Sequence, residues 1–216
     1  QPLGPVGRHQ PAALREQVHA RYGADMRDAP HFTRVINEGQ YRRLRAHLDD
    51  ARARGLQVIA LAEVDEARAE AEHLLPPTLV LDPGDDATVM QEEIFGPILP
   101  IRGYAALDDA IAHVERHDRP LALYPFSHDR DTVERILGRL VAGGVTVNDT
   151  LLHFAASDLP FGGIGPSGMG QYHGEAGFET FTKAMPVLWQ ARWSATDMLK
   201  PPYTGRIDQL VRKLTR

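Results

Sequence analysis

Short apolar runs alternate along this chain with longer segments whose apolar residues recur at helical spacing. Runs typical of buried strands lie at 58–61, 78–81, 98–101, 121–126 and 145–147. Helical spacing is found at 12–22, 38–54, 106–117, 131–140 and 175–182. Strands that alternate with helices of about ten residues form βαβ units, whose strands run parallel. The sequence therefore predicts an α/β fold, with a mainly parallel sheet and flanking helices.

The ends of the chain differ from this regular middle. Residues 1–11 are rich in glycine and proline and are expected to form a loose leader. Residues 183–216 are expected to protrude as a tail, with a strand near 187–189 and a helix at 205–214. Because no linker divides 12–182 into two cores, this part is predicted to be one compact domain.

Composition excludes several classes of protein. The 216 residues carry a net charge of −5, which argues against a nucleic-acid binder because phosphate neutralisation requires a basic surface. No apolar run approaches the roughly 18 residues of a membrane span. The sequence contains no cysteine, which excludes disulfides, thiolate metal ligands and thiol nucleophiles within it and fits a cytoplasmic location.

A glycine-rich segment covers residues 158–174, and Gly163, Gly165 and Gly168 match the dinucleotide-binding pattern G-x-G-x-x-G. That pattern binds phosphate where a strand leads directly into a helix. Here the nearest predicted strand ends well upstream, and Pro166 opposes immediate helix formation. We therefore expect a tight loop whose glycines allow close backbone packing, and a phosphate site is disfavoured.

Two adjacent acidic residues, Glu92 and Glu93, lie beside Phe95 between two predicted strands. Neighbouring side chains of an extended segment point in opposite directions, so one carboxylate can face a cleft. Two carboxylate oxygens at fixed spacing suit the hydroxyls of a sugar. A pair of solvated surface acids is the alternative, and composition alone favours it.

Asn148 and Asp149 directly follow the strand predicted at 145–147. Ligands of open α/β sheets bind at the carboxyl ends of parallel strands, so these polar side chains are candidates for a binding site. An Asx-turn that ends the strand explains them equally well.

The sequence contains ten histidines, so metal binding needs to be considered. His113 and His117 are four residues apart on a predicted helix, a spacing compatible with zinc. They lack the H-E-x-x-H pattern and an evident third ligand, so no metal site is predicted. His153 and His173 flank the glycine-rich segment, where they either line its pocket or are simply hydrogen-bonded surface histidines.

Several motifs occur in a fixed order: EEIFGP at 92–97, GGVTVND at 143–149 and PFGGIGPSGMG at 160–170. In this order they resemble the aldehyde dehydrogenase superfamily. The segments 119–124 and 172–181 resemble its class 3 branch, and the tail motif LKPPY at 199–203 resembles the coniferyl aldehyde dehydrogenases of that branch. The resemblance extends over about residues 12–216.

The resemblance implies NAD(P)-dependent oxidation of an aldehyde to a carboxylic acid, with NAD or NADP as cofactor. In such enzymes a cysteine thiolate attacks the aldehyde, hydride passes to nicotinamide, and a glutamate helps water to hydrolyse the thioester. An aromatic-lined tunnel implies a flat substrate such as coniferaldehyde. The segment 184–191 resembles the oligomerisation strand of the family, which implies a homodimer in which it extends the sheet of a partner subunit.

The resemblance also implies roles for individual residues. Glu93 is expected to hold the ribose of the nicotinamide, and Phe95 is expected to pack beside the nicotinamide ring. The pocket for the aldehyde is expected to be formed by Asn148, His153, Phe154 and Phe161.

The residues that carry the chemistry in this family are not found in the sequence. The nucleophilic cysteine belongs to a Gly-Gln-x-Cys segment, which by spacing falls at or just before residue 1. The general-base glutamate and a Rossmann-type cofactor domain lie further upstream. We therefore expect residues 12–182 to be part of a catalytic domain, with no catalytic residue in this chain and no activity by itself. The alternative is a non-catalytic truncated subunit, an interaction module that pairs with full-length homologues through 184–191.

Overall fold

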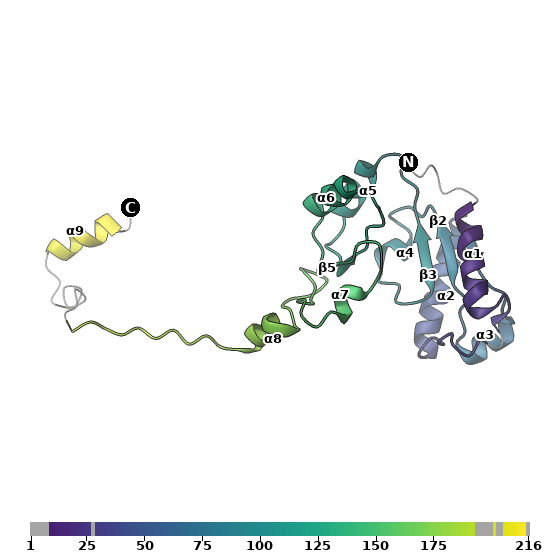
Figure 1. The fold of residues 1–216 in the computed structure, drawn as a ribbon, viewed down its shortest axis with the longest axis horizontal. Coiled ribbons are helices and arrows are strands. Elements are labelled where there is room, and N and C mark those ends of the chain that lie inside the picture. The colour runs from purple at the N-terminus through teal and green to yellow at the C-terminus, as the bar shows by residue number, and fades with distance from the viewer. Residues whose placement is uncertain (1–8, 27–28, 193–200, 202–204, 215–216) are drawn as a thin grey trace.

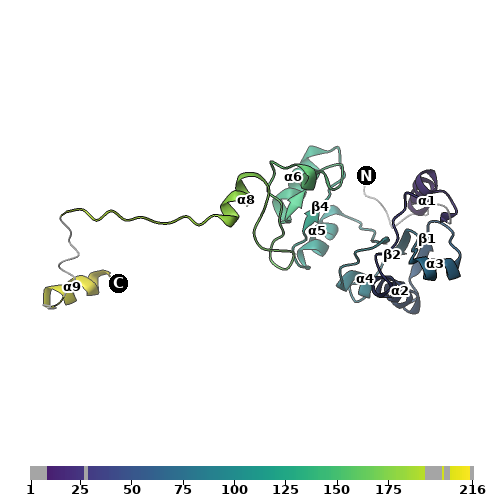
Figure 2. The same cartoon turned by 90° about the horizontal axis from the view of Figure 1, so that it is seen from below.

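The computed structural model describes residues 9–26, 29–192, 201 and 205–214. Figures 1 and 2 show two lobes and an extended tail that leads away from the second lobe. The first lobe contains the described residues up to Ile101, the second runs from Tyr104 to Phe181, and each has a sheet of its own. The last helix is α9 (Gly205–Leu214), as predicted from the sequence.

The first lobe is built on a three-stranded sheet in the order β1-β2-β3. β1 runs antiparallel to β2, with Val58 opposite Val80, whereas β2 and β3 are parallel, with Val80 opposite Pro100. The strands are β1 (Gln57–Ala60), β2 (Thr78–Leu81) and β3 (Ile98–Ile101). The helices of this lobe are α1 (His9–Tyr22), α2 (Glu38–Ala53), α3 (Glu66–Glu72) and α4 (Thr88–Gln91).

Helix α2 organises the core of the first lobe because its apolar residues fall on one face. Asn37 begins the helix, since its side chain accepts a hydrogen bond of 2.9 Å from the backbone N of Gln40. The apolar side chains that α2 buries recur every three or four residues: Tyr41, Leu44, Leu48 and Ala51. They form one cluster with Val80 and Ile98 of the sheet. Burial of this stripe, rather than helix propensity, therefore stabilises α2.

The second lobe has a smaller sheet, in which β4 (Ala122–Leu123) and β5 (Gly144–Val145) are parallel and Ala122 lies opposite Gly144. Helix α6 (Arg130–Arg139) connects the two strands and completes a βαβ unit. Backbone hydrogen bonds extend the pairing past the strands, from Thr146 N to Leu123 O at 3.2 Å and from Asn148 N to Pro125 O at 2.8 Å. The other helices are α5 (Leu107–Glu115), α7 (Leu152–Ala155) and α8 (Gly174–Phe181).

The predicted α/β class is confirmed, and two of the three strand pairings are parallel. The strands fall into two small sheets rather than one. In the described part of the chain, no backbone pairing joins β3 to β4. β1 and β2 are antiparallel because the connection through α3 returns to the end of the sheet that it left. No helix in the described ranges combines the length and hydropathy needed to cross a bilayer.

The two ends also differ from the prediction. Residues 1–8 of the expected leader lie outside the described residues, while 9–11 belong to α1. Pro11 is tolerated there because the first turn of a helix leaves backbone N–H groups without intrahelical partners. Residues 187–189 form no strand within the single chain, since a strand requires a second edge to pair with. Of the tail motif at 199–203, only residue 201 is described.

The glycine-rich segment is the tight loop that the sequence predicts. A Cβ on Gly163 would lie 2.0 Å from the backbone O of Ser167, and a Cβ on Gly162 would lie 2.1 Å from the backbone O of Gly170. Only hydrogen fits at such positions, because neighbouring backbone cannot move aside. The glycines therefore allow the loop to fold against itself.

We expect Gly163→Ala to lower the free energy of unfolding by about 2 kcal/mol, since the new methyl group overlaps backbone atoms. Gly138→Ala is the matched control, because Gly138 lies in α6 with nothing within 4 Å of an added Cβ. That change should raise stability by about 1 kcal/mol through helix propensity. Urea denaturation followed by circular dichroism measures the free energy of unfolding of both variants. Equal changes in this free energy would contradict the close packing of the loop.

Candidate functional site

An aromatic cluster forms where three segments of the second lobe meet, in the part of the lobe that contains β5 and α7 (Figure 1). The members of this aromatic cluster are Tyr124, His153, Phe154, Phe161, Tyr172 and His173. The ring centroid of Phe161 lies 5.4 Å from that of Phe154 and 5.4 Å from that of Tyr172, both edge to face. Reciprocal backbone hydrogen bonds of 2.9 Å between Phe161 and Tyr172 hold the two ends of the glycine-rich loop together.

Three of the four residues expected to form the aldehyde pocket lie together in this cluster. The ring centroid of His153 is 5.8 Å from that of Phe161, and Phe154 contacts the same ring. The sequence offered His173 either as a lining residue of this pocket or as a surface histidine, and it did not indicate Tyr124 or Tyr172 for the pocket. Tyr172 pairs with Phe161 across the loop, a relation that no local sequence pattern reveals.

His153 is the buried centre of the aromatic cluster, with a relative exposure of 8%. Its Nδ1 lies 2.9 Å from Oγ1 of Thr146, and its backbone N donates to the same oxygen at 3.2 Å. Its ring packs over Gly144, where a Cβ would lie 2.4 Å from His153 Cδ2. The absence of a side chain at Gly144, the first residue of β5, therefore leaves room for the imidazole.

Two ring nitrogens of the aromatic cluster, Nε2 of His153 and Nδ1 of His173, are buried without a hydrogen-bond partner in the described part of the chain. A buried polar atom without a partner costs free energy, so such atoms mark positions where a bound group brings a compensating contact. The backbone of His173 is also in the left-handed region, with φ of 77°. Backbone strain of this kind concentrates at functional sites.

Asn148 follows the carboxyl end of β5, and its side-chain amide is hydrogen-bonded to the backbone of another segment. Its Oδ1 accepts from the backbone N of Ser127 at 2.8 Å, and its Nδ2 donates to the backbone O of Ser127 at 2.9 Å. Both bonds tie β5 to the segment that follows β4, and they require the backbone of Asn148 to adopt a φ of 59°. The residue therefore fastens the sheet beside the aromatic cluster, and a second N–H and a second lone pair of its exposed amide remain for a ligand.

Glu93 and Phe95 lie in the first lobe, between α4 and β3. Both are exposed, Phe95 by 85%, and Phe95 has a positive φ of 45°. The hydrogen bonds of the segment 92–96 run to α2, whereas the ring contacts of the aromatic cluster lie within the second lobe. The structure thus places the expected cofactor residues and the expected aldehyde pocket on separate lobes.

Helix α2 contacts the segment 92–96 through Arg43, Leu44 and His47, whose Nε2 lies 3.8 Å from Oε2 of Glu92. Sequence reasoning missed Arg43 and His47 because the helical period places Arg43 away from the apolar face and predicts nothing about His47. His47 is buried, and this burial together with the neighbouring Arg43 lowers its pKa. Both effects favour the neutral imidazole.

The two histidines considered for metal binding meet Asp85, and the potential ligand atoms of the three residues lie within 4.8 Å of one another. Arg102 donates to the Asp85 carboxylate and to His113 Nδ1, the latter at 3.1 Å. The guanidinium holds the pKa of Asp85 below its usual range, and burial together with Arg102 lowers the pKa of His113. This cluster is thus already neutralised by an arginine.

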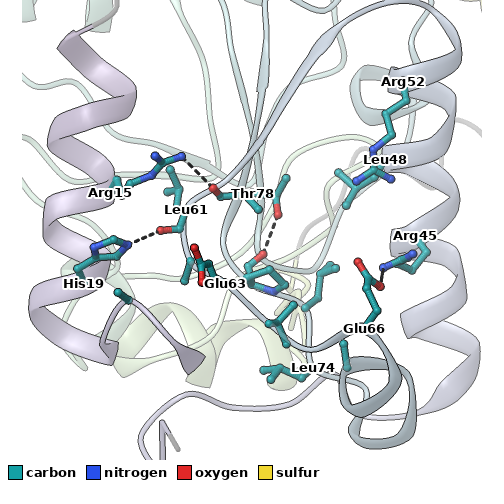
Figure 3. A pocket seen from close by; sticks show the side chains of 17 residues that line it. Arg15, His19, Arg45, Leu48, Arg52, Leu61, Glu63, Glu66, Leu74 and Thr78 are labelled. Atoms are coloured by element: carbon teal, nitrogen blue, oxygen red, sulfur yellow. Dashed lines mark hydrogen bonds and ion pairs between the residues drawn. The ribbon is translucent and has the colours of Figure 1, made fainter. Parts of the chain in front are cut away.

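Figure 3 shows a pocket of about 600 Å³ between α1 and α2. Arg15 and His19 point into it from α1, and Arg45 and Arg52 point into it from α2. Arg45 is paired with Glu66, its Nη1 lying 2.9 Å from Oε2 of the glutamate. None of the residues expected in the functional site lines this pocket, so it is distinct from the aromatic cluster and from the segment 92–96.

Comparison with known proteins identifies the family of this chain. A model of the aldehyde dehydrogenase family matches residues 11–187. The chain is 48% identical over 187 residues to a probable coniferyl aldehyde dehydrogenase of Caulobacter vibrioides, a match covering 85% of this chain and 39% of the relative. It is 50% identical over 187 residues to the protein of the same name in Pseudomonas aeruginosa, covering 87% and 38%. The mouse protein named aldehyde dehydrogenase family 3 member A2 is 40% identical over 175 residues, which agrees with the class 3 resemblance.

Solved structures agree with these relatives. The substrate-bound state of Staphylococcus aureus AldH has a TM-score of 0.73 and 37% sequence identity, and the match covers 94% of this chain and 43% of that one. Mycobacterium tuberculosis aldehyde dehydrogenase complexed with NAD+ has a TM-score of 0.67 and 26% identity, covering 78% and 34%. The chain spans about two fifths of the length of the curated relatives it matches. Since the family model covers most of the sequence and the motifs occur in the family's order, the chain belongs to the aldehyde dehydrogenase family.

Proposed function

We propose that this chain supplies two parts of an NAD(P)-dependent aldehyde dehydrogenase: the wall of the aldehyde pocket and a contact to the nicotinamide ribose. The observation that carries the proposal is the aromatic cluster, in which side chains from three segments meet around two unpartnered histidine nitrogens. Rings arranged edge to face present flat apolar walls that suit a planar conjugated aldehyde. We propose coniferaldehyde as the substrate because the Caulobacter and Pseudomonas relatives are named probable coniferyl aldehyde dehydrogenases.

The segment 92–96 fits a nicotinamide coenzyme. The Glu93 carboxylate has no hydrogen bond or ion pair with the described residues, so both oxygens are available to accept from ribose hydroxyls. The ring of Phe95 is 85% exposed and therefore free to pack beside the nicotinamide. Bound NAD(P)+ supplies the hydride acceptor for the oxidation. The role of this chain is to hold and orient the coenzyme and the aldehyde.

The nucleophile must come from elsewhere, because the 216 residues contain no cysteine. A thiolate attacks the aldehyde carbon in this chemistry, and the thioester that follows hydride loss is hydrolysed by water. We therefore propose that the chain oxidises aldehydes only together with polypeptide that contributes the thiolate, the general base and the coenzyme domain.

We expect no NADH formation when this chain alone is mixed with coniferaldehyde and NAD+. Fusion to the part of the Caulobacter relative that the chain does not cover should give aldehyde-dependent NADH formation, measured by absorbance at the wavelength of NADH. The same fusion with its catalytic cysteine changed to serine is the control. Turnover by the chain alone, or an inactive fusion that folds and binds NAD+, would overturn this proposal.

In that fusion, Phe161→Leu should raise KM for coniferaldehyde about tenfold, because loss of edge-to-face contacts removes on the order of 1.4 kcal/mol from the pocket. Phe178→Leu is the matched control, since Phe178 is 70% exposed on α8 and lies outside the aromatic cluster. Steady-state kinetics over a range of aldehyde concentrations distinguish the two variants. If both variants have a similar KM, Phe161 does not contact the aldehyde.

We also propose that 184–191 pairs with the sheet edge of a second copy, giving a homodimer. This segment has no strand partner among the described residues and exposes four large apolar side chains by 62% to 89%: Met185, Val187, Leu188 and Trp189. An extended segment gains backbone hydrogen bonds and buries such side chains when it adds to a sheet. The competing function, an interaction module without catalysis, uses the same segment to bind a full-length homologue.

Leu188→Asp should convert a dimer into a monomer, because a carboxylate is costly to bury in the pairing surface. Light scattering coupled to size-exclusion chromatography measures the mass, with Lys183→Asp as a control outside the segment. A monomeric parent chain, or a dimer that tolerates Leu188→Asp, would argue against pairing through 184–191. Capture of a full-length homologue by a chain whose fusion is inactive would favour the interaction module.

A further inference from the structure

We propose that Arg43 is a positioning residue, which holds the segment 92–96 in the conformation that presents Glu93 and Phe95. This inference rests on the proposed function, in which those two residues contact the coenzyme. Arg43 itself lies on α2 and acts through the backbone of the segment.

The guanidinium of Arg43 reaches two consecutive carbonyl oxygens of the segment. Its Nη1 donates to the backbone O of Glu93 at 2.9 Å, and its Nη2 donates to the backbone O of Ile94 at 2.6 Å. The planar fork of a guanidinium fixes the separation and direction of two such donors, which a single ammonium group cannot do. Arg43 thus fixes the two peptide units that immediately precede Phe95.

Those peptide units are where the segment needs external support. Phe95 has a φ of 45°, a region that bulky side chains rarely adopt, and its ring is 85% exposed. Neither the local backbone conformation nor burial of the ring favours this arrangement. A strained residue persists only where surrounding contacts determine its conformation. Arg43 provides such contacts through the carbonyl oxygens of the two residues that precede Phe95.

Arg43 is in turn oriented by a hydrogen-bonded chain of fixed direction. Its Nη1 lies 3.0 Å from Nε2 of His47, and because a guanidinium only donates, that nitrogen accepts. The proton of His47 is therefore on Nδ1, which donates to Oγ1 of Thr88 at 3.0 Å. The Thr88 hydroxyl donates to Oδ2 of Asp50 at 3.2 Å. The chain of bonds ends on a carboxylate and begins on a cation, so each member polarises the next.

Close packing of α2 completes the support. A Cβ on Gly96 would lie 2.5 Å from Cδ1 of Leu44, so the glycine lets α2 pack closely against the segment with Leu44 in its present position. Arg43 and Leu44 are consecutive residues, and His47 is one turn further along the same helix. Arg43 therefore contacts residues 93 and 94, and Leu44 contacts Gly96. Through these contacts α2 determines the backbone conformation of the segment.

The variants that test this inference are Arg43→Ala, Arg43→Lys and the control Arg42→Ala. Arg42 immediately precedes Arg43 on α2 and is exposed. Its Nη2 lies 2.5 Å from Oε1 of Glu38 on the same helix. Backbone ¹⁵N relaxation of the chain measures the mobility of Glu93, Ile94 and Phe95. Order parameters near 0.85 are expected in the parent and in Arg42→Ala, values below about 0.6 in Arg43→Ala, and intermediate values in Arg43→Lys.

A spectroscopic signature separates positioning from a general loss of stability. The ¹⁵N shifts of the His47 ring should report the Nδ1–H tautomer in the parent and loss of that preference in Arg43→Ala, with the rest of the spectrum unchanged. Rigid residues 93–95 in Arg43→Ala, or equal loosening in Arg42→Ala, would overturn the inference. A spectrum that collapses throughout would show that Arg43 serves the fold and would also overturn it.

The consequence for the coenzyme is measured in the fusion described above. Arg43→Ala should raise KM for NAD+ about tenfold while kcat changes less than twofold, and Arg42→Ala should leave both unchanged. An inactive parent fusion would count against the proposed function, whereas an active parent with an unaltered KM in Arg43→Ala would count against this inference alone.

Discussion

The first lobe depends on the burial of one helical stripe. Leu44 and Leu48 of α2 are almost fully buried against the three-stranded sheet, and this contact fixes the rotation of the helix about its axis. With the rotation fixed, Arg43 and His47 are directed at the segment that leads into β3, and Arg45 and Arg52 are directed at the pocket beside α1. A hydrophobic contact therefore determines where the polar groups of the lobe act.

The second lobe arranges its residues differently, through backbone rather than through a large core. The close approaches at Gly143, Gly144 and Gly163 let strand, helix and loop meet where any side chain would overlap a neighbour. The free energy cost of this arrangement is visible in the positive φ angles of Asn148 and His173. Both residues adjoin or belong to the aromatic cluster, so strain, orphaned nitrogens and aromatic surface occur together.

Much of this fold follows from the periodicity of the sequence. The apolar spacing of 38–54 and the continuous apolar run at 78–81 predict α2 and β2, because α2 buries one face and β2 is buried on both. The helices α3, α4 and α7 span only 4 to 7 residues, too few for a helical period to appear, and were not predicted. Motif resemblance identified His153, Phe154 and Phe161 together, whereas the support given by Arg43 depends on a contact 50 residues away in sequence.

The unequal distribution of buried apolar surface between the lobes affects how the chain opens. Nearly all buried apolar side chains of the described residues belong to the first lobe, and the second contributes Ile111 and Pro125. Cooperative units with few buried contacts open at lower free energy than the molecule as a whole. We therefore expect the second lobe to open at a lower free energy than the first, and whatever occupies the aromatic cluster to contribute directly to its protection.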